Sequence, residues 1–268
     1  MAIFDFDSAI VRSPARSVVR GLRAGDQQDP SHAVVDAEHA RYVAALEAAG
    51  LAVEVLPSLE AFPDSMFVED PALVFTEGAI LLRPGAPSRR GEVRQLRPTL
   101  ERRFERVLAL GEGFADGGDV LVAPTGVYIG LSARTDEAGA RALIAALDAL
   151  GRRGRIASTP PGTLHLKTAS SLVDEETVLV TAALAASGMF SGLRTLVVPD
   201  DEPGAANTLR VNGVVLAAEH YPRTLDLLCG HGLEVVALPV SEVAKIDAGL
   251  SCMSLRWRTA GAAAAPGG

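Results

Sequence analysis

The sequence has 268 residues, of which 48% are apolar, and its formal charge of -8 comes from 25 basic and 33 acidic side chains. This charge disfavours nucleic acid as a partner, and a chain of this length buries enough surface to fold without disulfide or metal support. No apolar run approaches the ~18 residues that span a bilayer, and no basic segment precedes an apolar one at the start. We therefore expect a cytoplasmic protein with no membrane partner.

Helical and strand patterns alternate along the chain. Three helical patterns are each followed by a strand pattern, at 31–50, 134–150 and 222–231. The strands that follow them read LAVEVLP, GRIAST and LEVVALP. Two weaker helices are expected, one from about Ser88, which Pro98 should kink or end, and one near 182–191.

Between the helices lie four expected β-hairpins. Three carry glycine at the turn before an alternating apolar strand, in EGAIL (77–81), TGVYI (125–129) and NGVVL (212–216), and ETVLV (176–180) has the same form without glycine. A fifth sheet would form if the C-terminal strand MSLRW paired with the N-terminal strand near AIVRS. The sequence thus predicts an α/β fold, a propeller-like ring of five units that is closed by its own termini.

Five polar residues recur at nearly the spacing of these units. Asp70, Asp116, His165, Asn207 and Cys252 are separated by 46, 49, 42 and 45 positions. If each belongs to an equivalent loop, the five side chains converge on the axis of a pseudo-fivefold ring.

The two cysteines, Cys229 and Cys252, form no CxxC motif, which excludes a zinc ribbon and a disulfide framework. Cys252 stands at the start of an apolar strand and is a candidate nucleophile, although a buried core cysteine would look the same. Cys229 lies on the apolar face of the 222–231 helix, where packing explains it.

A histidine and an acid could accompany the nucleophile. His165 lies between leucines in PPGTLHLKTASS and is either a catalytic base or a half-buried histidine bonded to a backbone carbonyl. Asp116, in FADGGDVLV, could orient an imidazole as the third member of a Cys-His-acid set. Asp119, in the same motif, could be a turn residue.

The stretch FPDSMFVEDP (62–71) places three carboxylates around Phe67 with no local Lys or Arg, namely Asp64, Glu69 and Asp70. A solvated acidic turn is one interpretation. Because the flanking residues are apolar, the other is a site for a substrate guanidinium, whose fork geometry matches carboxylates. Arg89 and Arg134 each precede a helix and could hold a substrate carboxylate.

The chain resembles the dimethylarginine dimethylaminohydrolase family, especially its bacterial members. The runs PDSMFVEDP, RPGAPSRRGE, DGGDVL, GLSARTDEAGA, LHLKTAS, PDDEPGAAN, EHYPRT and KIDAGLSCMSLRW match it in order over residues 8 to 257. The resemblance implies the pentein fold, an α/β-propeller of five ββαβ-like units around a pore. It also implies hydrolysis of Nω-methylated arginines to citrulline and methylamine or dimethylamine.

The resemblance implies a role for each matching residue. Cys252 would be the nucleophile, His165 the general acid and base, and Asp116 its partner. The substrate would be bound by Leu22 on a flexible lid, Asp64, Phe67, Glu69, Asp70, Arg89, Arg134 and the backbone of Ile246. Glu69 and Asp70 would take the guanidinium, and Asp64, Arg89 and Arg134 the amino-acid end. The acid before GGD is Asp here, whereas some bacterial relatives have Glu.

We expect one catalytic domain over 1–259 and a disordered tail over 260–268. The chemistry requires no cofactor or metal, although Zn²⁺ could occupy Cys252 and His165 as an inhibitor. The expected partner is a small-molecule substrate, and the protein would be a monomer or a homodimer. Two alternatives remain open, an arginine or agmatine deiminase and, more remotely, a non-catalytic propeller that binds another molecule. The compact length and RPGAPSRR favour the methylarginine hydrolase.

Overall fold

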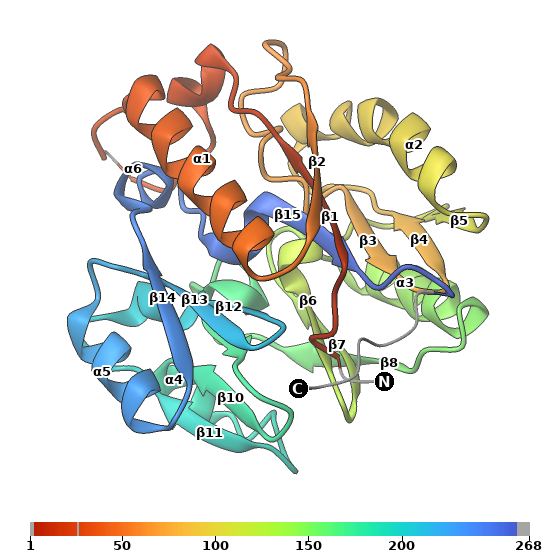
Figure 1. Ribbon diagram of the computed structural model, residues 1–268. Coiled ribbons are helices and arrows are strands. Elements are labelled where there is room, and N and C mark those ends of the chain that lie inside the picture. Colours follow the sequence, from red (N-terminus) through yellow and green to blue (C-terminus); the bar gives the residue numbers. More distant parts are fainter. Residues whose placement is uncertain (1–2, 26, 262–268) are drawn as a thin grey trace.

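The computed structural model describes residues 3–25 and 27–261, whose strands form five three-stranded sheets (Figure 1). The first sheet consists of β15 (Ser254–Trp257), β1 (Ser8–Arg12) and β2 (Ala52–Leu56). The next two consist of β3 (Ala72–Phe75), β4 (Gly78–Leu81) and β5 (Val107–Ala109), and of β6 (Val120–Ala123), β7 (Gly126–Leu131) and β8 (Gly154–Ser158). The last two consist of β9 (Ser170–Leu172), β10 (Thr177–Val180) and β11 (Arg194–Val197), and of β12 (Leu209–Val211), β13 (Val214–Ala218) and β14 (Glu234–Leu238).

Each sheet is an antiparallel pair of strands extended by a third, parallel strand. The predicted turns join the antiparallel pairs. Gly78, at the first turn, has a φ of 150°, and a Cβ there would lie 2.6 Å from the carbonyl oxygen of Arg106. At NGVVL it is Asn212, with a φ of 48°, that takes the left-handed conformation. The four predicted hairpins are therefore confirmed.

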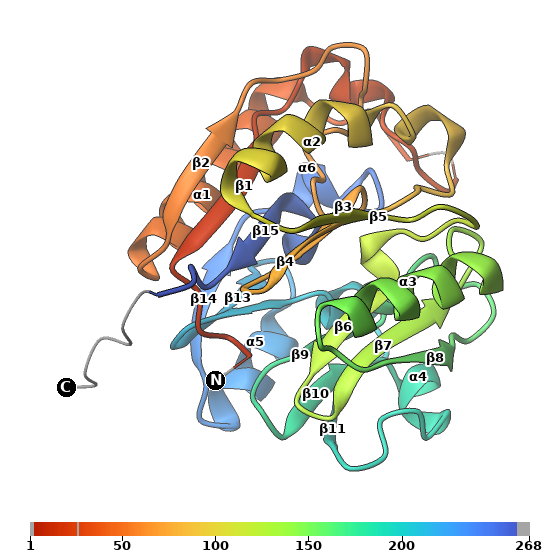
Figure 2. The same ribbon diagram turned by 90° about the vertical axis from the view of Figure 1, so that its right-hand side faces the viewer.

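The two ends of the chain close the ring, as predicted. β1 pairs antiparallel with β15, with Ile10 opposite Leu255, and parallel with β2, with Val11 opposite Val55. Figure 2 shows β1 and β15 side by side, although they lie at opposite ends of the sequence. The five sheets are thus the five units of a ring, and the predicted α/β-propeller architecture is confirmed.

The helices lie on the periphery of the ring (Figure 1). They are α1 (His32–Ala48), α2 (Glu92–Arg103), α3 (Glu137–Ala149), α4 (Ala182–Ala186), α5 (Pro222–Gly230) and the unpredicted α6 (Ser241–Ala244). α4 is shorter than the predicted 182–191 because Gly188, with a φ of 65°, leaves the helical conformation. No helix in the described part of the chain is long and apolar enough to cross a membrane.

Pro98 does not end its helix, contrary to one form of the prediction. α2 begins at Glu92, later than expected, and continues past Pro98 to Arg103. Proline has no N–H, so Pro98 cannot donate a hydrogen bond to the carbonyl of Arg94. Both residues are exposed, so water can bond to that carbonyl instead. On the buried side of α2, Leu96 and Leu100 pack into the core. The proline is tolerated because it lies on the outer face.

The five predicted polar residues lie in the loops that lead into the first strands of the five units. Asp70 precedes β3, Asp116 precedes β6, His165 precedes β9, Asn207 precedes β12 and Cys252 precedes β15. These first strands are neighbours at the centre, since β15 contacts β3, β6 contacts β9, and β9 contacts β12. The fold therefore brings the five loops to one end of the ring axis. Most of the expected tail, 262–268, lies outside the described residues.

We predict that Val11 on β1 contributes more to the stability of the protein than its partner Val55 on β2. Val11 is fully buried at 0% exposure, whereas its partner Val55 is 49% exposed. Val11→Ala should lower the free energy of unfolding by about 2 kcal/mol because it removes buried methyl groups and leaves a cavity. The matched Val55→Ala should change it by less than about 0.5 kcal/mol. Urea unfolding of both variants measures the two free energies of unfolding. Equal losses would contradict the different contributions assigned to Val11 and Val55.

Candidate active site

A cavity of about 140 Å³ opens at the end of the ring where the loops meet. Among its lining residues are Leu22, Asp64, Phe67, Asp70, Arg89, Arg134, His165, Ile246 and Cys252. Of the residues expected to form the site, Glu69 and Asp116 alone are outside this lining. Residues from distant parts of the sequence thus meet at one place, since the first strands of all five units converge there.

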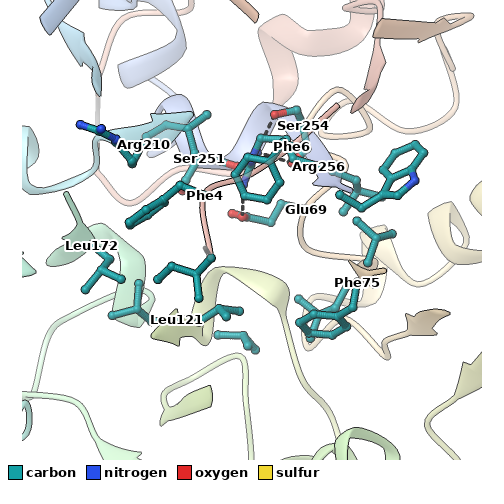
Figure 3. A pocket seen from close by; sticks show the side chains of 18 of the residues that line it. Phe4, Phe6, Glu69, Phe75, Leu121, Leu172, Arg210, Ser251, Ser254 and Arg256 are labelled. Atoms are coloured by element: carbon teal, nitrogen blue, oxygen red, sulfur yellow. Dashed lines mark hydrogen bonds and ion pairs between the residues drawn. The ribbon is translucent and has the colours of Figure 1, made fainter. Parts of the chain in front are cut away.

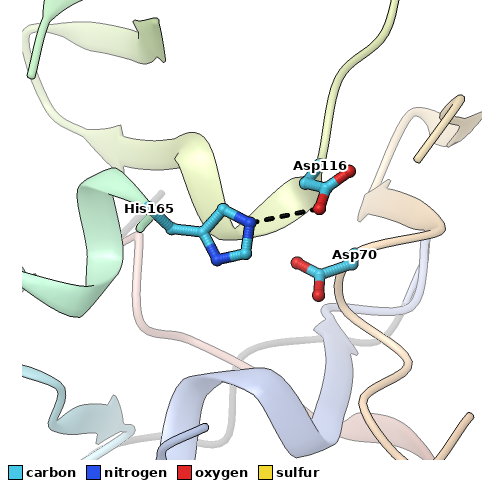
Figure 4. Close-up of side chains that lie close together, drawn as sticks. All are labelled: Asp70, Asp116 and His165. Carbon is cyan, nitrogen blue, oxygen red and sulfur yellow. Dashed lines mark hydrogen bonds and ion pairs between the residues drawn. The ribbon is translucent and has the colours of Figure 1, made fainter. Parts of the chain in front are cut away.

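His165 and Asp116 form a hydrogen-bonded pair beside this cavity (Figure 4). The imidazole Nε2 lies 3.1 Å from the Asp116 Oδ2, and Asp116 is fully buried. The other carboxylate oxygen of Asp116 accepts the backbone N–H of Gly85 at 2.8 Å. Because the pair uses Nε2, the Nδ1 atom remains for proton exchange with a bound molecule.

Asp70 is a second carboxylate close to the His165 ring, in addition to Asp116 (Figure 4). Its Oδ1 accepts the backbone N–H of Gly118 at 2.9 Å, and its Oδ2 accepts a hydrogen bond from Arg89. Burial acts to lower the pKa of His165, but Asp70, the bond to Asp116 and the charge of Asp119 outweigh it and raise that pKa. A raised pKa favours the protonated imidazole, the form that can act as an acid.

Cys252 is half-buried in the cavity wall. The side-chain amide of Asn207 lies 4.0 Å from its sulfur, so all five predicted loop residues gather here. Burial, together with the nearby carboxylates of Glu69 and Asp70, raises the pKa of the thiol to about 11. In the ligand-free protein Cys252 is therefore a thiol at neutral pH.

Arg89 lies under the cavity and binds the acidic loop that precedes β3. Its guanidinium donates to the Asp70 carboxylate, to the carbonyl of Phe67 at 2.9 Å and to the carbonyl of Asp64 at 3.1 Å. It also pairs with Glu92 at 2.8 Å, and burial raises the pKa of Glu92 to about 7 despite that arginine. Most of the Arg89 donors are thus used within the protein.

Arg134 and Asp64 lie at other points of the cavity. The Arg134 guanidinium is 3.8 Å from Asp116 Oδ2, and its side chain is 20% exposed, which leaves donors available. Asp64 accepts the backbone N–H of Leu22 at 2.8 Å, and burial raises the pKa of its carboxyl. The cavity thus offers both an acidic and a basic side chain, which suits a zwitterion.

Glu69 does not line this cavity but faces a second one. Its Oε1 lies 2.5 Å from the ammonium group of Lys167 and 3.4 Å from Arg256, and its Oε2 is buried with no hydrogen-bond partner among the described residues. Figure 3 shows the second cavity, of about 220 Å³, with Glu69 and Arg256 between Phe4, Phe6 and other apolar side chains. The backbone N–H of Glu69 donates to the carbonyl of Cys252 at 3.2 Å, so this acid lies next to the cysteine segment.

The acidic stretch 62–71 has no Lys or Arg of its own, but the fold gives its carboxylates cationic partners from elsewhere in the chain. Asp70 pairs with Arg89, and Glu69 pairs with Lys167 and Arg256. A bound guanidinium is therefore not needed to balance these buried charges.

Asp70, Asp116 and His165 could together approach a metal ion, since ligand atoms of the three lie within 4.8 Å of one another. Both carboxylates already accept bonds from Arg89, Gly118 and Gly85. This set of three residues is not the Cys252 and His165 pair that was expected to take Zn²⁺. The contacts of Asp70 and Asp116 indicate that the three form a hydrogen-bonding network around the imidazole.

Sequence reasoning missed several residues of this site and misplaced one. Lys167 and Glu92 are buried ionisable groups that pair with Glu69 and Arg89, and the signal for Lys167 was a lone lysine inside the apolar run LHLKTAS. Asp119, which could have been a turn residue, is buried among the loops of the site. Cys229 is exposed, so the expectation that it packs on the apolar face of its helix is wrong. Leu228 takes that buried position instead.

Comparison with known proteins gives consistent family assignments. A family profile described as N,N dimethylarginine dimethylhydrolase, eukaryotic, matches residues 22–151. The chain is 38% identical to N(G),N(G)-dimethylarginine dimethylaminohydrolase of Pseudomonas aeruginosa, over 94% of this chain and 100% of that protein. It is 34% identical to the protein of the same name from Streptomyces coelicolor, over 93% of this chain and 96% of that one.

Solved structures agree with these sequence matches. The P. aeruginosa enzyme, as a cysteine-to-serine mutant complexed with citrulline, superposes with a TM-score of 0.91 at 37% identity and covers 94% of this chain and 100% of its own. The N-terminal domain of ArgZ, a cyanobacterial arginine dihydrolase, gives a TM-score of 0.82 at 16% identity over 94% of this chain and 97% of that one, which shows a shared fold. The chain belongs to the dimethylarginine dimethylaminohydrolase family.

Proposed function

We propose that this protein hydrolyses Nω-methylated arginines to L-citrulline and methylamine or dimethylamine, with Cys252 as the nucleophile. The observation that carries the proposal is the full-length similarity to the P. aeruginosa enzyme together with one cavity that contains Cys252, His165 and carboxylates. A cysteine, a histidine and an acid are the groups that covalent catalysis at a guanidinium carbon requires.

The first half of the reaction replaces the amine by sulfur. Asp70 holds the substrate guanidinium beside Cys252, and the positive charge of the substrate favours the thiolate over the thiol, whose proton passes to solvent. The sulfur attacks the guanidinium carbon and forms a tetrahedral adduct. Protonated His165 gives its proton to the departing methylamine or dimethylamine, the C–N bond breaks, and an S-alkylthiouronium remains on Cys252.

The second half returns the enzyme to its starting state. His165, now neutral, takes a proton from water, and the oxygen attacks the thiouronium carbon. The C–S bond then breaks, the hydroxyl of the adduct becomes the carbonyl of the ureido group of citrulline, and the departing sulfur takes up the hydroxyl proton, so that Cys252 is again a thiol. Asp116 stabilises the imidazolium in each half through its bond to Nε2.

The amino-acid end of the substrate needs partners of both signs. We assign the carboxylate of the substrate to Arg134, because most donors of Arg89 are already bound to protein groups. Arg89 acts from the cavity floor by fixing Asp70. The ammonium group of the substrate goes to Asp64 and to the backbone near Leu22 and Ile246, which line the same cavity with Phe67. Glu69 lies outside this cavity but next to the Cys252 segment, so we assign its effect on the guanidinium to its negative charge.

We also propose that residues 1–259 act as one catalytic domain and that the reaction takes place in the cytoplasm. The ring closes between β1 and β15, which supports the single domain. The mechanism needs Cys252 as a free thiol, which the reducing cytosol maintains. All residues of the proposed site belong to one chain, so a monomer suffices and a homodimer is compatible with it.

A substrate panel tests the function. The wild-type protein is incubated with arginine, monomethylarginine, asymmetric dimethylarginine and agmatine, and the products are identified by mass. We expect citrulline and dimethylamine from asymmetric dimethylarginine. Cys252→Ser should lower that turnover by more than about 1,000-fold, whereas the control Cys229→Ser should retain it. Ammonia release from arginine or agmatine alone would contradict the proposal and favour a deiminase, and no turnover of any substrate would favour a binding protein.

The protonation state of the nucleophile gives a second prediction. With a thiol pKa of about 11, the alkylation of Cys252 by iodoacetamide in the Cys229→Ser background should become about tenfold faster per unit between pH 7 and pH 10. This follows because the thiolate fraction rises tenfold per unit below the pKa. Mass spectrometry of the labelled protein measures the rate. A plateau near pH 8.5, where an unperturbed thiol titrates, would show that Glu69, Asp70 and burial do not suppress ionisation.

The carboxylate clamp gives a third prediction. Arg134→Ala should raise KM for asymmetric dimethylarginine by about 10- to 100-fold, because a charged hydrogen-bonded pair is lost. It should change KM little for the decarboxylated counterpart of that substrate, which has no carboxylate to bind. Arg141→Ala, on the exposed face of α3, is the matched control and should change neither constant. Equal losses for both substrates would assign Arg134 to the support of Asp116 instead.

A further inference from the structure

Asp119 is a fully buried carboxylate that the mechanism above does not use. It is 0% exposed and stands at the end of the short 3-10 helix Gly117–Asp119, directly before β6. Both of its oxygens accept hydrogen bonds, and the donors come from three residues on two other segments of the chain, namely Ser132, Thr135 and Leu166. A turn residue would bond within its own loop. Asp119 instead joins segments that carry the proposed reacting groups.

The first connection leads to Asp116. The Thr135 hydroxyl donates to Asp119 Oδ2 at 2.7 Å, and the oxygen of the same hydroxyl accepts the backbone N–H of Asp116 at 3.1 Å. Thr135 is 1% exposed, so water does not compete for these bonds. Asp119 therefore fixes the direction of a hydroxyl that anchors the acid of the pair.

The second connection leads to His165. Asp119 Oδ1 accepts the backbone N–H of Leu166 at 2.9 Å, directly after the histidine in sequence. A Cβ on Gly118 would lie 2.8 Å from the imidazole, so the ring packs directly on the Gly118 backbone. Asp119 therefore fixes the segment that carries His165, and Gly118 leaves room for its ring.

The third connection leads to Arg134. The Ser132 hydroxyl donates to Asp119 Oδ2 at 2.6 Å, and the oxygen of that hydroxyl accepts the backbone N–H of Arg134 at 3.0 Å. A single carboxylate thus fixes the backbone next to three residues that we assign to proton transfer and substrate binding.

We propose that Asp119 is a positioning residue for the reaction, which holds the Asp116–His165 pair and Arg134 in one rigid arrangement. This inference deepens the proposed function and rests on it. Catalysis by proton transfer depends on such geometry, because a displacement of ~1 Å in a reacting group can cost about 100-fold in rate. The site needs a carboxylate here, since Oδ2 accepts from two hydroxyls whose own oxygens already accept backbone N–H groups.

Asp119 also acts on His165 through its charge. The acidic groups that face the imidazole are Asp70, Asp116 and Asp119, with Cys252 in the same cavity and Arg134 beyond Asp116. Removal of one negative charge should make the imidazolium easier to deprotonate. This effect separates a positioning role from general support of the fold.

The test compares Asp119→Asn with the wild-type protein. In the variant the amide has one accepting oxygen, so its NH2 group must face either the Leu166 N–H or the two hydroxyls. We therefore expect kcat for asymmetric dimethylarginine to fall by about 10- to 100-fold with a smaller change in KM. The titration of His165, followed by NMR of the ¹³C-histidine-labelled protein, should move to lower pH. Unchanged kcat and an unchanged His165 titration would overturn the proposal.

Two further comparisons keep the test informative. Asp136→Asn is the matched control, because Asp136 also joins two segments, through Phe114 and Gly139, but lies outside the cavity. It should lower the melting temperature without moving the His165 titration. Thr135→Val should lower kcat while Thr135→Ser restores it, which tests the hydroxyl even if Asp119→Asn does not fold. If the wild-type protein hydrolyses no methylarginine, the proposed function fails, whereas the His165 titration still decides the role of Asp119.

Discussion

The crowding of buried negative charge at the ring axis is the constraint on which the rest of this site depends. Five carboxylates lie within the converging loops, those of Asp64, Glu69, Asp70, Asp116 and Asp119. Negative charges that are poorly solvated repel one another strongly, so each of these carboxylates needs a cationic partner or several hydrogen-bond donors. Arg89, Lys167 and Arg256 supply cations from other loops. Burial of the thiol, together with the remaining charge of Glu69 and Asp70, raises the pKa of Cys252 and favours the protonated sulfur in the absence of a cationic substrate.

Much of the fold was predictable from the sequence because its signals are local. Turn residues before short apolar strands identify the hairpins, and helical spacing identifies α1, α3 and α5. The closing pair of β1 with β15 was predictable for a different reason, since four hairpins and five helices left two unpaired terminal strands. The regular spacing of Asp70, Asp116 and His165 followed from the same repeat, because each stands before the first strand of its unit.

The partners of the site residues were not predictable in the same way. Lys167 is far from Glu69 in sequence, and Arg256 is 187 positions from it, so no local pattern joins them. Asp119 has the composition of a turn residue, and its three donors are visible only once the loops converge. Pro98 was misjudged because a helix tolerates proline on a solvated face, and the sequence does not tell which face that is. Long-range packing decides each of these cases.

The position of β15 late in the sequence affects how the protein folds during its synthesis. Cys252 lies in the 3-10 turn Leu250–Met253, directly before β15, which leaves the ribosome after all the other described strands. Until β15 pairs with β1, the first unit lacks its inner strand, and the sulfur has no fixed place beside His165. A nascent chain, or one shortened by proteolysis within β15, therefore carries the other residues of the proposed site without Cys252 held beside them. Closure of the ring is the step that completes the proposed site.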